Sequence, residues 1–100
     1  MVGGITVSPL EIERVLAEHP SVREVAVAAV VDGIGATRLQ AFVVPTHRNS
    51  DEAELETELL GLARRRLAPF KVPRAAHLTT ALPRTATGKL RRHIVRTGAW

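Results

Sequence analysis

The chain has 100 residues, of which 45% are hydrophobic and 24% are charged, and it contains no cysteine. This length and composition are typical of one small globular domain and exclude a disordered chain, a disulfide-stabilised scaffold and a thiolate metal site. The formal net charge is +4, with acidic residues concentrated at positions 51–58 and arginines in the last third. We expect a single domain over residues 1–100 in the reducing cytoplasm, and no apolar run approaches the roughly 20 residues that span a bilayer.

The first predicted element is a helix over residues 7–20. Ser8 is a suitable N-cap residue, and Pro9 stands at the first helical position, where proline is favoured. Glu11 has the spacing from Ser8 that a capping box needs. Pro20 is expected to end this helix.

Two strands are predicted next, over residues 22–31 and 38–44. Both segments are rich in β-branched residues, and the connection between them is too short for a parallel crossover, so the pair should be antiparallel. A second helix is predicted over residues 51–67, where leucines recur at helical spacing. Its acidic start and arginine-rich end complement the helix dipole, and we favour this structural explanation of the charges over contact with nucleic acid.

Two prolines shape the segment after the second helix: Pro69 should end the helix, and Pro73 should keep residues 69–74 extended. The remaining elements are a third strand over residues 75–80, a loop over 81–89 and a short basic helix over 90–96. The predicted fold is therefore α+β. It has a small, largely antiparallel three-stranded sheet packed by two amphipathic helices, followed by a lysine-bearing loop and a short C-terminal helix.

The loop contains the sequence PRTATGKL at residues 83–90, in which Lys89 follows a glycine. A phosphate-binding P-loop needs G-x-x-x-x-G-K followed by Ser or Thr. Here Pro83 replaces the first glycine and Leu90 replaces the hydroxyl residue, so this is not a P-loop. Pro83 stiffens the base of the loop, and Gly88 relieves the steric limits of the backbone before the lysine. The pattern is compatible with a loop that presents Lys89 for chemistry and with an ordinary exposed lysine.

The segment LPRTATGKLRR, residues 82–92, resembles the C-terminal lysine signature of the adenylate-forming enzymes. This family includes acyl- and aryl-CoA synthetases, luciferases and peptide-synthetase adenylation domains. Three further segments are similar to the family in the same order and spacing: GGITVSPLEIERVLAEHPSVREVAV at 3–27, LQAFVVP at 39–45 and RLAPFKVPR at 66–74. Peptide-synthetase domains usually have Asn where this chain has Thr87, and the chain looks most like benzoate-type aryl-CoA ligases and medium-chain acyl-CoA synthetases.

The resemblance implies two half-reactions. In this family a carboxylate attacks the α-phosphate of Mg-ATP to give an acyl-adenylate, and the thiol of CoA then displaces AMP. The small C-terminal domain rotates between the two steps. Lys89 matches the catalytic lysine of adenylation, and Pro83, Thr85 and Gly88 would shape its loop. Gly4 matches the glycine that lines the pantetheine tunnel in the second step, although a simple turn or strand-edge glycine is an equally good interpretation.

The same resemblance makes Arg91 and Arg92 candidate contacts of the CoA phosphates, whereas the residues themselves favour solvated arginine near a helix end. No metal site is predicted, because the four histidines lack metal-ligand spacing. The implied cofactors are Mg-ATP and CoA in the full-length enzyme, with none bound to this chain alone. The implied partner is the family's large N-terminal domain, which holds the acid and adenine pockets. Nothing in these 100 residues corresponds to that domain, so we expect the chain alone to be inactive.

A second interpretation makes the chain a target for reversible lysine acetylation. In this family the lysine that matches Lys89 is acetylated by protein acetyltransferases and restored by deacetylases. Acetylation removes the positive charge that adenylation needs. A nucleic-acid binder is disfavoured, because stacking aromatic residues are nearly absent and the acidic start of the second helix opposes a phosphate backbone.

Overall fold

The computed structural model describes residues 8–31, 33–47, 49–97 and 100. Along the chain its elements are α1 (Pro9–Leu16), β1 (Val22–Val31), β2 (Thr37–Pro45), α2 (Glu52–Arg66), the 3-10 helix η1 (Pro69–Lys71), β3 (Ala75–Leu78) and α3 (Arg92–Val95). This order confirms the predicted α+β arrangement of helix, two strands, helix, strand, loop and short helix.

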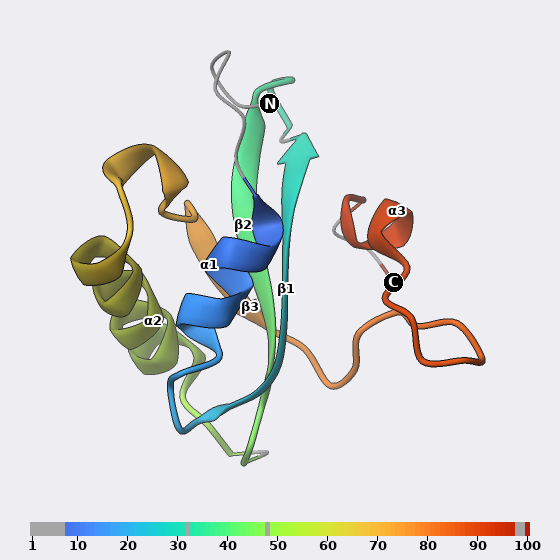
Figure 1. The fold of residues 1–100 in the computed structure, drawn as a ribbon, viewed down its shortest axis with the longest axis horizontal. Helices are drawn as coiled ribbons and strands as arrows, with labels where there is room; N and C mark the ends of the chain where they lie inside the picture. Colours follow the sequence, from blue (N-terminus) through green and yellow to red (C-terminus); the bar gives the residue numbers. More distant parts are fainter. Residues whose placement is uncertain (1–7, 32, 48, 98–99) are drawn as a thin grey trace.

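The three strands form one sheet in the order β1-β2-β3 (Figure 1). β1 and β2 are antiparallel along nine Cα pairs, whereas β3 runs parallel to β2 along four. The connection from β2 to β3 contains α2, and a crossover of this length is what a parallel neighbour requires. The prediction of a largely antiparallel sheet is confirmed, and its one parallel pair lies at an edge.

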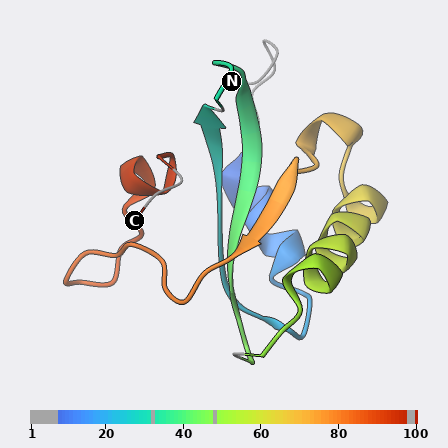
Figure 2. The same ribbon diagram turned by 180° about the vertical axis from the view of Figure 1, so that it is seen from behind.

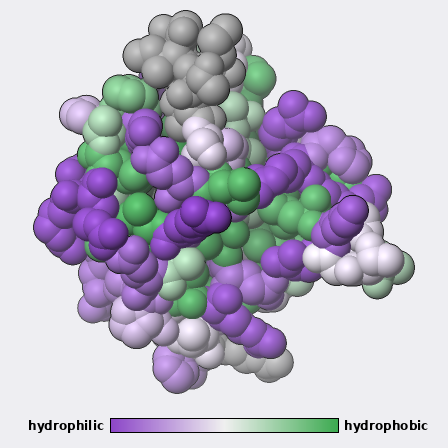
Figure 3. All heavy atoms as spheres, viewed as in Figure 1, coloured by the Kyte–Doolittle hydropathy of each residue, from purple (hydrophilic) through white to green (hydrophobic). Residues whose placement is uncertain are grey.

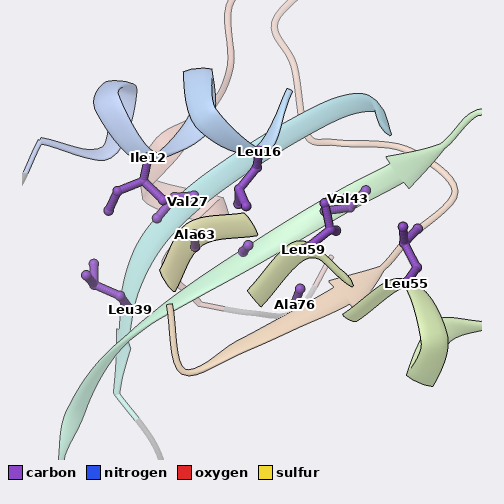
Figure 4. Packing of buried hydrophobic residues seen from close by; sticks show 10 residues of the cluster. Ile12, Leu16, Val27, Leu39, Val43, Leu55, Leu59, Ala63 and Ala76 are labelled. Carbon is purple, nitrogen blue, oxygen red and sulfur yellow. The ribbon is translucent and has the colours of Figure 1, made fainter. Parts of the chain in front are cut away.

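Helices α1 and α2 pack together on one face of the sheet, as the views from the front and from behind both show (Figures 1 and 2). Ile12 of α1 and Leu59 of α2 are fully buried, and they meet Val27 of β1 and Val43 of β2 (Figure 4). Burying one such aliphatic side chain stabilises a fold by about 1.5–3 kcal/mol. This cluster is therefore the main core, and it fixes the orientation of both helices on the sheet.

The opposite face of the sheet is covered by the chain that follows β3 (Figures 1 and 2). Phe42 and Val44 of β2 pack there with Leu82 and Val95, and Leu90 lies against the same cluster. Successive residues of a strand point to opposite faces, so β2 contributes to both cores. This second cluster anchors the segment that bears Lys89.

The start of α1 differs from the predicted capping box. Within the described part of the chain, Ser8 occupies the N-cap position but its side chain makes no capping hydrogen bond. Glu11 instead pairs with Lys71, at 3.0 Å between Nζ and Oε1. The Glu11 side chain, which a capping box would need, therefore forms a tertiary ion pair instead.

Two predicted boundaries are also wrong. α1 ends at Leu16, because the next residues form 3-10-type hydrogen bonds from the Glu18 and His19 amides before Pro20 is reached. Residues 69–71 form the 3-10 helix η1 instead of an extended segment. Pro69 stands at its first position, where the fixed φ of proline suits a helical turn.

Candidate functional site

Residues 83–91 form a short hairpin that carries Lys89. The amide of Arg91 donates to the carbonyl of Pro83 at 2.8 Å, and the amide of Thr85 donates to the carbonyl of Lys89 at 2.8 Å. Arg84 and Leu90 face each other as an antiparallel bridge between the two arms. The hairpin projects from the body of the domain beside α3 (Figures 1 and 3). The predicted loop is thus an ordered turn with a defined direction.

The tip of the hairpin depends on Gly88. Its amide donates to the carbonyl of Thr85 at 2.9 Å, and its φ is +88°. This left-handed backbone conformation is strained for residues with a Cβ atom, and a three-residue hairpin loop commonly ends with glycine in it. The geometry agrees with the sequence-based reason for a glycine immediately before Lys89.

The peptide group between Gly88 and Lys89 is held at both of its polar atoms. The amide of Lys89 donates to the Thr85 hydroxyl at 3.1 Å, and the carbonyl of Gly88 accepts from Nη1 of Arg84 at 3.1 Å. The guanidinium of Arg84 also donates to Oε1 of Glu24, from Nη2 at 2.8 Å and from Nε at 3.1 Å. Neither Arg84 nor Glu24 was predicted as a site residue; the position of Arg84 within the lysine signature was the only sequence signal for this pair.

The side chain of Lys89 is exposed, and its amine makes no hydrogen bond or ion pair with any residue that the structure describes. Lys71, the other lysine of the chain, differs in this respect. Its Nζ lies 3.0 Å from both carboxylate oxygens of Glu11. Lys89 therefore offers an unneutralised positive charge beyond the surface of the domain, as the predicted role requires.

The two arginines after the hairpin have different surroundings. Arg91 is exposed, whereas Arg92 donates from Nη1 and Nη2 to the two carboxylate oxygens of Glu13, each at 3.0 Å. The Glu13 side chain is only 12% exposed and also accepts from the amide of Val27 at 2.8 Å. The hydrogen bond that Arg92 donates to Glu13 raises the pKa of Arg92, and the desolvation that opposes this effect is smaller.

The ion pair with Glu13 gives Arg92 a structural role, because it ties α3 to α1 and β1. Contact of Arg91 and Arg92 with CoA phosphates stays a prediction, and Arg92 would have to share its guanidinium with Glu13. Gly4, the residue predicted to line the pantetheine tunnel, lies outside the described residues.

An open hollow of about 500 Å³ lies on the face of the sheet opposite α1 and α2, and Lys89 is not among the residues that line it. His77 and Gln40 form a hydrogen bond of 2.7 Å at its floor, and Phe42 and Trp100 meet edge to face, with their ring centroids 4.8 Å apart. Within the described residues there is no group of three His, Cys, Asp or Glu side chains arranged to bind a metal, and no helix long and apolar enough to cross a membrane.

Residues 11–89 match the family described as AMP-binding enzyme C-terminal domain. Over 96 residues the chain is 40% identical to the p-hydroxybenzoic acid–AMP ligase FadD22 of Mycobacterium marinum, covering 96% of this chain and 14% of that protein. Over 90 residues it is 42% identical to the long-chain-fatty-acid–CoA ligase of Bacillus subtilis, covering 90% of this chain and 16% of that protein.

Solved structures show the same relationship. The benzoate CoA ligase of Burkholderia xenovorans matches with a TM-score of 0.84 and 42% identity, over 90% of this chain and 18% of that one. The anthranilate CoA ligase AuaEII, solved in complex with anthranoyl-AMP, matches with a TM-score of 0.88 and 36% identity, over 98% of this chain and 19% of that one. The chain spans less than a fifth of the length of these relatives. It therefore belongs to the family of AMP-binding enzyme C-terminal domains, and its relatives include acyl- and aryl-CoA ligases.

Proposed function

We propose that this chain serves as the C-terminal domain of an AMP-forming acyl- or aryl-CoA ligase, in which Lys89 promotes adenylation of the carboxylic acid. The observation that carries the proposal is the exposed amine of Lys89 on an ordered hairpin, with no internal partner among the described residues. The family match and the two aryl-CoA ligases among the solved structures support it. They also favour an aromatic carboxylate as the substrate class.

The chemical task of Lys89 follows from its charge. Adenylation brings a carboxylate against the α-phosphate of ATP, and two anions repel each other. One ammonium group between them attracts both and stabilises the charge that develops in the transition state. A charge pair at 4 Å is worth about 4 kcal/mol at an effective dielectric constant near 20. Lysine suits this task because its charge is compact and stands on a long stem.

The residues at the hairpin fit a phosphate group better than a metal ion. Lys89 and Arg91 are exposed cations, and the carboxylate of Glu24 beside the hairpin already binds Arg84. Magnesium prefers carboxylate and phosphate oxygens. In this proposal the large N-terminal domain and the ATP phosphates hold the magnesium ion, and the hairpin supplies only positive charge.

The second half-reaction is proposed to use another edge of the domain. After rotation, Gly4 would line the tunnel for the pantetheine arm of CoA, where a missing side chain lets the thiol pass close to the backbone. A bulky residue in place of Gly4 should then slow thioester formation and leave adenylation intact. Slower adenylation with an unchanged thioester step would contradict this assignment.

Without a large domain the chain is proposed to be inactive. Lys89 projects from the surface on a hairpin, so the acid and the nucleotide need a facing partner to be brought against it. The purified 100-residue chain, incubated with ATP, CoA and benzoate, should release no pyrophosphate above the buffer rate. Formation of benzoyl-CoA by the chain alone would contradict this part of the proposal.

The decisive experiment uses a fusion in which residues 1–100 replace the corresponding segment of the Burkholderia xenovorans benzoate CoA ligase. Adenylation is followed by pyrophosphate release, and thioester formation is followed separately from preformed benzoyl-AMP and CoA. Lys89→Ala should lower the adenylation rate by roughly 10²–10³, the usual effect of losing one preorganised donor. Thioester formation from benzoyl-AMP should be unchanged.

The matched control is Lys71→Ala, which removes the only other lysine of the chain. Lys71 pairs with Glu11 of α1 and is not part of the hairpin, so its loss should leave both half-reactions within about twofold of the unsubstituted fusion. Equal loss of both half-reactions in Lys89→Ala would count against the proposed role.

Regulation by acetylation is a second proposal, which the contrast between the two lysines favours. Lys89 is exposed and has no described partner, whereas Lys71 is three-quarters buried at its side chain and pairs with Glu11. Incubation with a bacterial protein acetyltransferase and acetyl-CoA should add one acetyl group, at Lys89. A deacetylase should then remove this acetyl group and restore the positive charge of Lys89. Equal labelling of Lys71, measured by mass spectrometry, would argue against a specific site.

A further inference from the structure

The orientation of Lys89 depends on an arginine that is not part of the proposed chemistry. Nη1 of Arg84 donates to the carbonyl of Gly88 at 3.1 Å, which is the carbonyl of the peptide group that leads into Lys89. The other polar atom of this peptide group, the Lys89 amide nitrogen, donates to the Thr85 hydroxyl. A peptide plane held at its N–H and its C=O cannot rotate freely, so the direction in which the Lys89 side chain leaves the backbone is set.

Arg84 is itself oriented by β1. Its Nε and Nη2 donate to Oε1 of Glu24, at 3.1 and 2.8 Å, which leaves Nη1 directed at Gly88. Glu24 lies within the antiparallel ladder, opposite Val44 of the central strand. The planar guanidinium forms these bonds as one rigid fork, which a lysine ammonium does not reproduce. The sheet therefore holds Glu24, Glu24 orients Arg84, and Arg84 binds the carbonyl of Gly88 in the hairpin.

We propose that Glu24 and Arg84 are positioning residues that aim Lys89 for adenylation, with Arg84 acting through the carbonyl of Gly88. This inference rests on the proposed role of Lys89. Neither residue needs to touch the substrate, since a displacement of about 1 Å at a reacting group is enough to cost roughly a hundredfold in rate. The ion pair is also half-exposed, with side-chain exposures of 33% for Glu24 and 39% for Arg84, so its loss should affect aim more than folding.

The test uses the full chain in the benzoate CoA ligase fusion described above. Glu24→Leu, which removes the oxygen that accepts from Nε and Nη2 of Arg84, should lower kcat for adenylation by roughly tenfold or more, with the KM for ATP and for benzoate changed by less than about twofold. The thioester step from benzoyl-AMP should stay within about twofold, which also reports that the variant is folded. Lys89→Ala serves as the reference for complete loss of the amine.

The matched control is Glu18→Leu. Glu18 pairs with Arg66 through both carboxylate oxygens, and the two side chains are 47% and 50% exposed. This pair joins the turn after α1 to the end of α2 and does not include a hairpin residue, so its loss should leave both half-reactions within about twofold. If Glu24→Leu behaves like Glu18→Leu, the ion pair of Glu24 has no positioning role.

A charge-exchanged double variant separates positioning from simple tethering. Glu24→Arg combined with Arg84→Glu restores an ion pair between β1 and the hairpin, but a carboxylate at position 84 has no hydrogen to donate to the carbonyl of Gly88. Adenylation should therefore stay at the level of Glu24→Leu. Recovery to the unsubstituted rate would overturn the route through Gly88, because a tether alone would then be sufficient.

The two levels of the proposal fail separately. If Lys89→Ala abolishes adenylation while Glu24→Leu does not slow it, Lys89 keeps its role and the positioning inference is wrong. If Lys89→Ala leaves adenylation unchanged, the proposed function itself is wrong, whatever the Glu24 variants do.

Discussion

Glu13 and Glu56 bind backbone amides at the two opposite edges of the sheet. These two amides belong to residues at the two ends of one cross-strand row. Glu13 of α1 accepts from the amide of Val27 in β1 at 2.8 Å, and Glu56 of α2 accepts from the amide of Ala76 in β3 at 2.9 Å. Val27 pairs with Ala41 of β2, and Ala41 pairs with Ala76. Each edge strand of a small sheet exposes unpaired amides, and here the packed helices satisfy one on each side.

The first prediction concerns these two carboxylates. Glu56→Leu should lower the free energy of unfolding by about 1–3 kcal/mol, because the amide of Ala76 loses its acceptor in a partly buried place. Glu13→Leu should cost more, since it leaves both Val27 and Arg92 without their acceptor. Glu56→Gln is the control, as its amide oxygen still accepts, and it should cost less than Glu56→Leu. Urea unfolding of the 100-residue chain measures all three, and equal effects of Glu56→Leu and Glu56→Gln would contradict the edge role.

The same substitution at two glycines should have opposite effects. Gly61 lies inside α2, and a Cβ atom there would meet only Arg65 at an ordinary 3.6 Å, so Gly61→Ala should stabilise the domain by about 0.5–1 kcal/mol. Gly88 has open space around it but a φ of +88°, so Gly88→Ala should destabilise the hairpin through backbone strain of about 1–2 kcal/mol.

Thermal unfolding and adenylation by the fusion distinguish these outcomes. Gly61→Ala should raise Tm without changing either half-reaction, whereas Gly88→Ala should slow adenylation selectively. Gly88→Asn should be milder than Gly88→Ala, because asparagine adopts the left-handed conformation more readily. A Gly88→Ala variant with full adenylation would show that the turn tolerates a Cβ atom and that Lys89 does not depend on it.

The ion pair between Arg92 and Glu13 leads to a prediction about pH. The hydrogen bond to Glu13 raises the pKa of Arg92 above its usual value, so the stabilising effect is present at every pH below the ordinary pKa of arginine and is lost only as the pH rises through the higher folded-state pKa. Arg92→Met should lower the free energy of unfolding by about 1–3 kcal/mol, since Glu13 is left nearly buried without its cation. This loss should be the same at pH 7, 8 and 10. A loss that disappears by pH 10 would show that another group carries the effect.

The shape of the Lys89 charge can be tested by Lys89→Arg in the fusion. Arginine keeps the positive charge but places it on a larger planar group, which binds oxyanions as a fork and not as a point charge. Adenylation should therefore be faster than in Lys89→Ala and slower than in the unsubstituted fusion, measured by pyrophosphate release. A rate equal to that of Lys89→Ala would mean that charge alone contributes little.

The local elements of this protein followed from sequence patterns with small errors. The β-branched runs predicted as strands at 22–31 and 38–44 are β1 and β2, and the leucine spacing at 51–67 is α2. Asp51 caps that helix by accepting from the amide of Glu54 at 3.0 Å. These features depend on residues within one turn or one hairpin, and short-range patterns report such interactions directly. The error at the start of α1 occurred where a distant residue, Lys71, binds Glu11, whereas η1 is a local turn that begins at Pro69.

The sequence by itself also singled out Lys89 and the glycine before it, because a hairpin tip and a signature motif are both local. Only the tertiary structure decided how that lysine is aimed. Glu24 and Arg84 are 60 positions apart, and Glu13 and Arg92 are 79 apart. No spacing rule links residues so distant, and they meet only after α1 and the segment following β3 have packed on opposite sides of the sheet. The residue types of the site are thus evident from the local sequence, whereas the contacts that hold the Lys89 segment form only when the layers of the fold pack together.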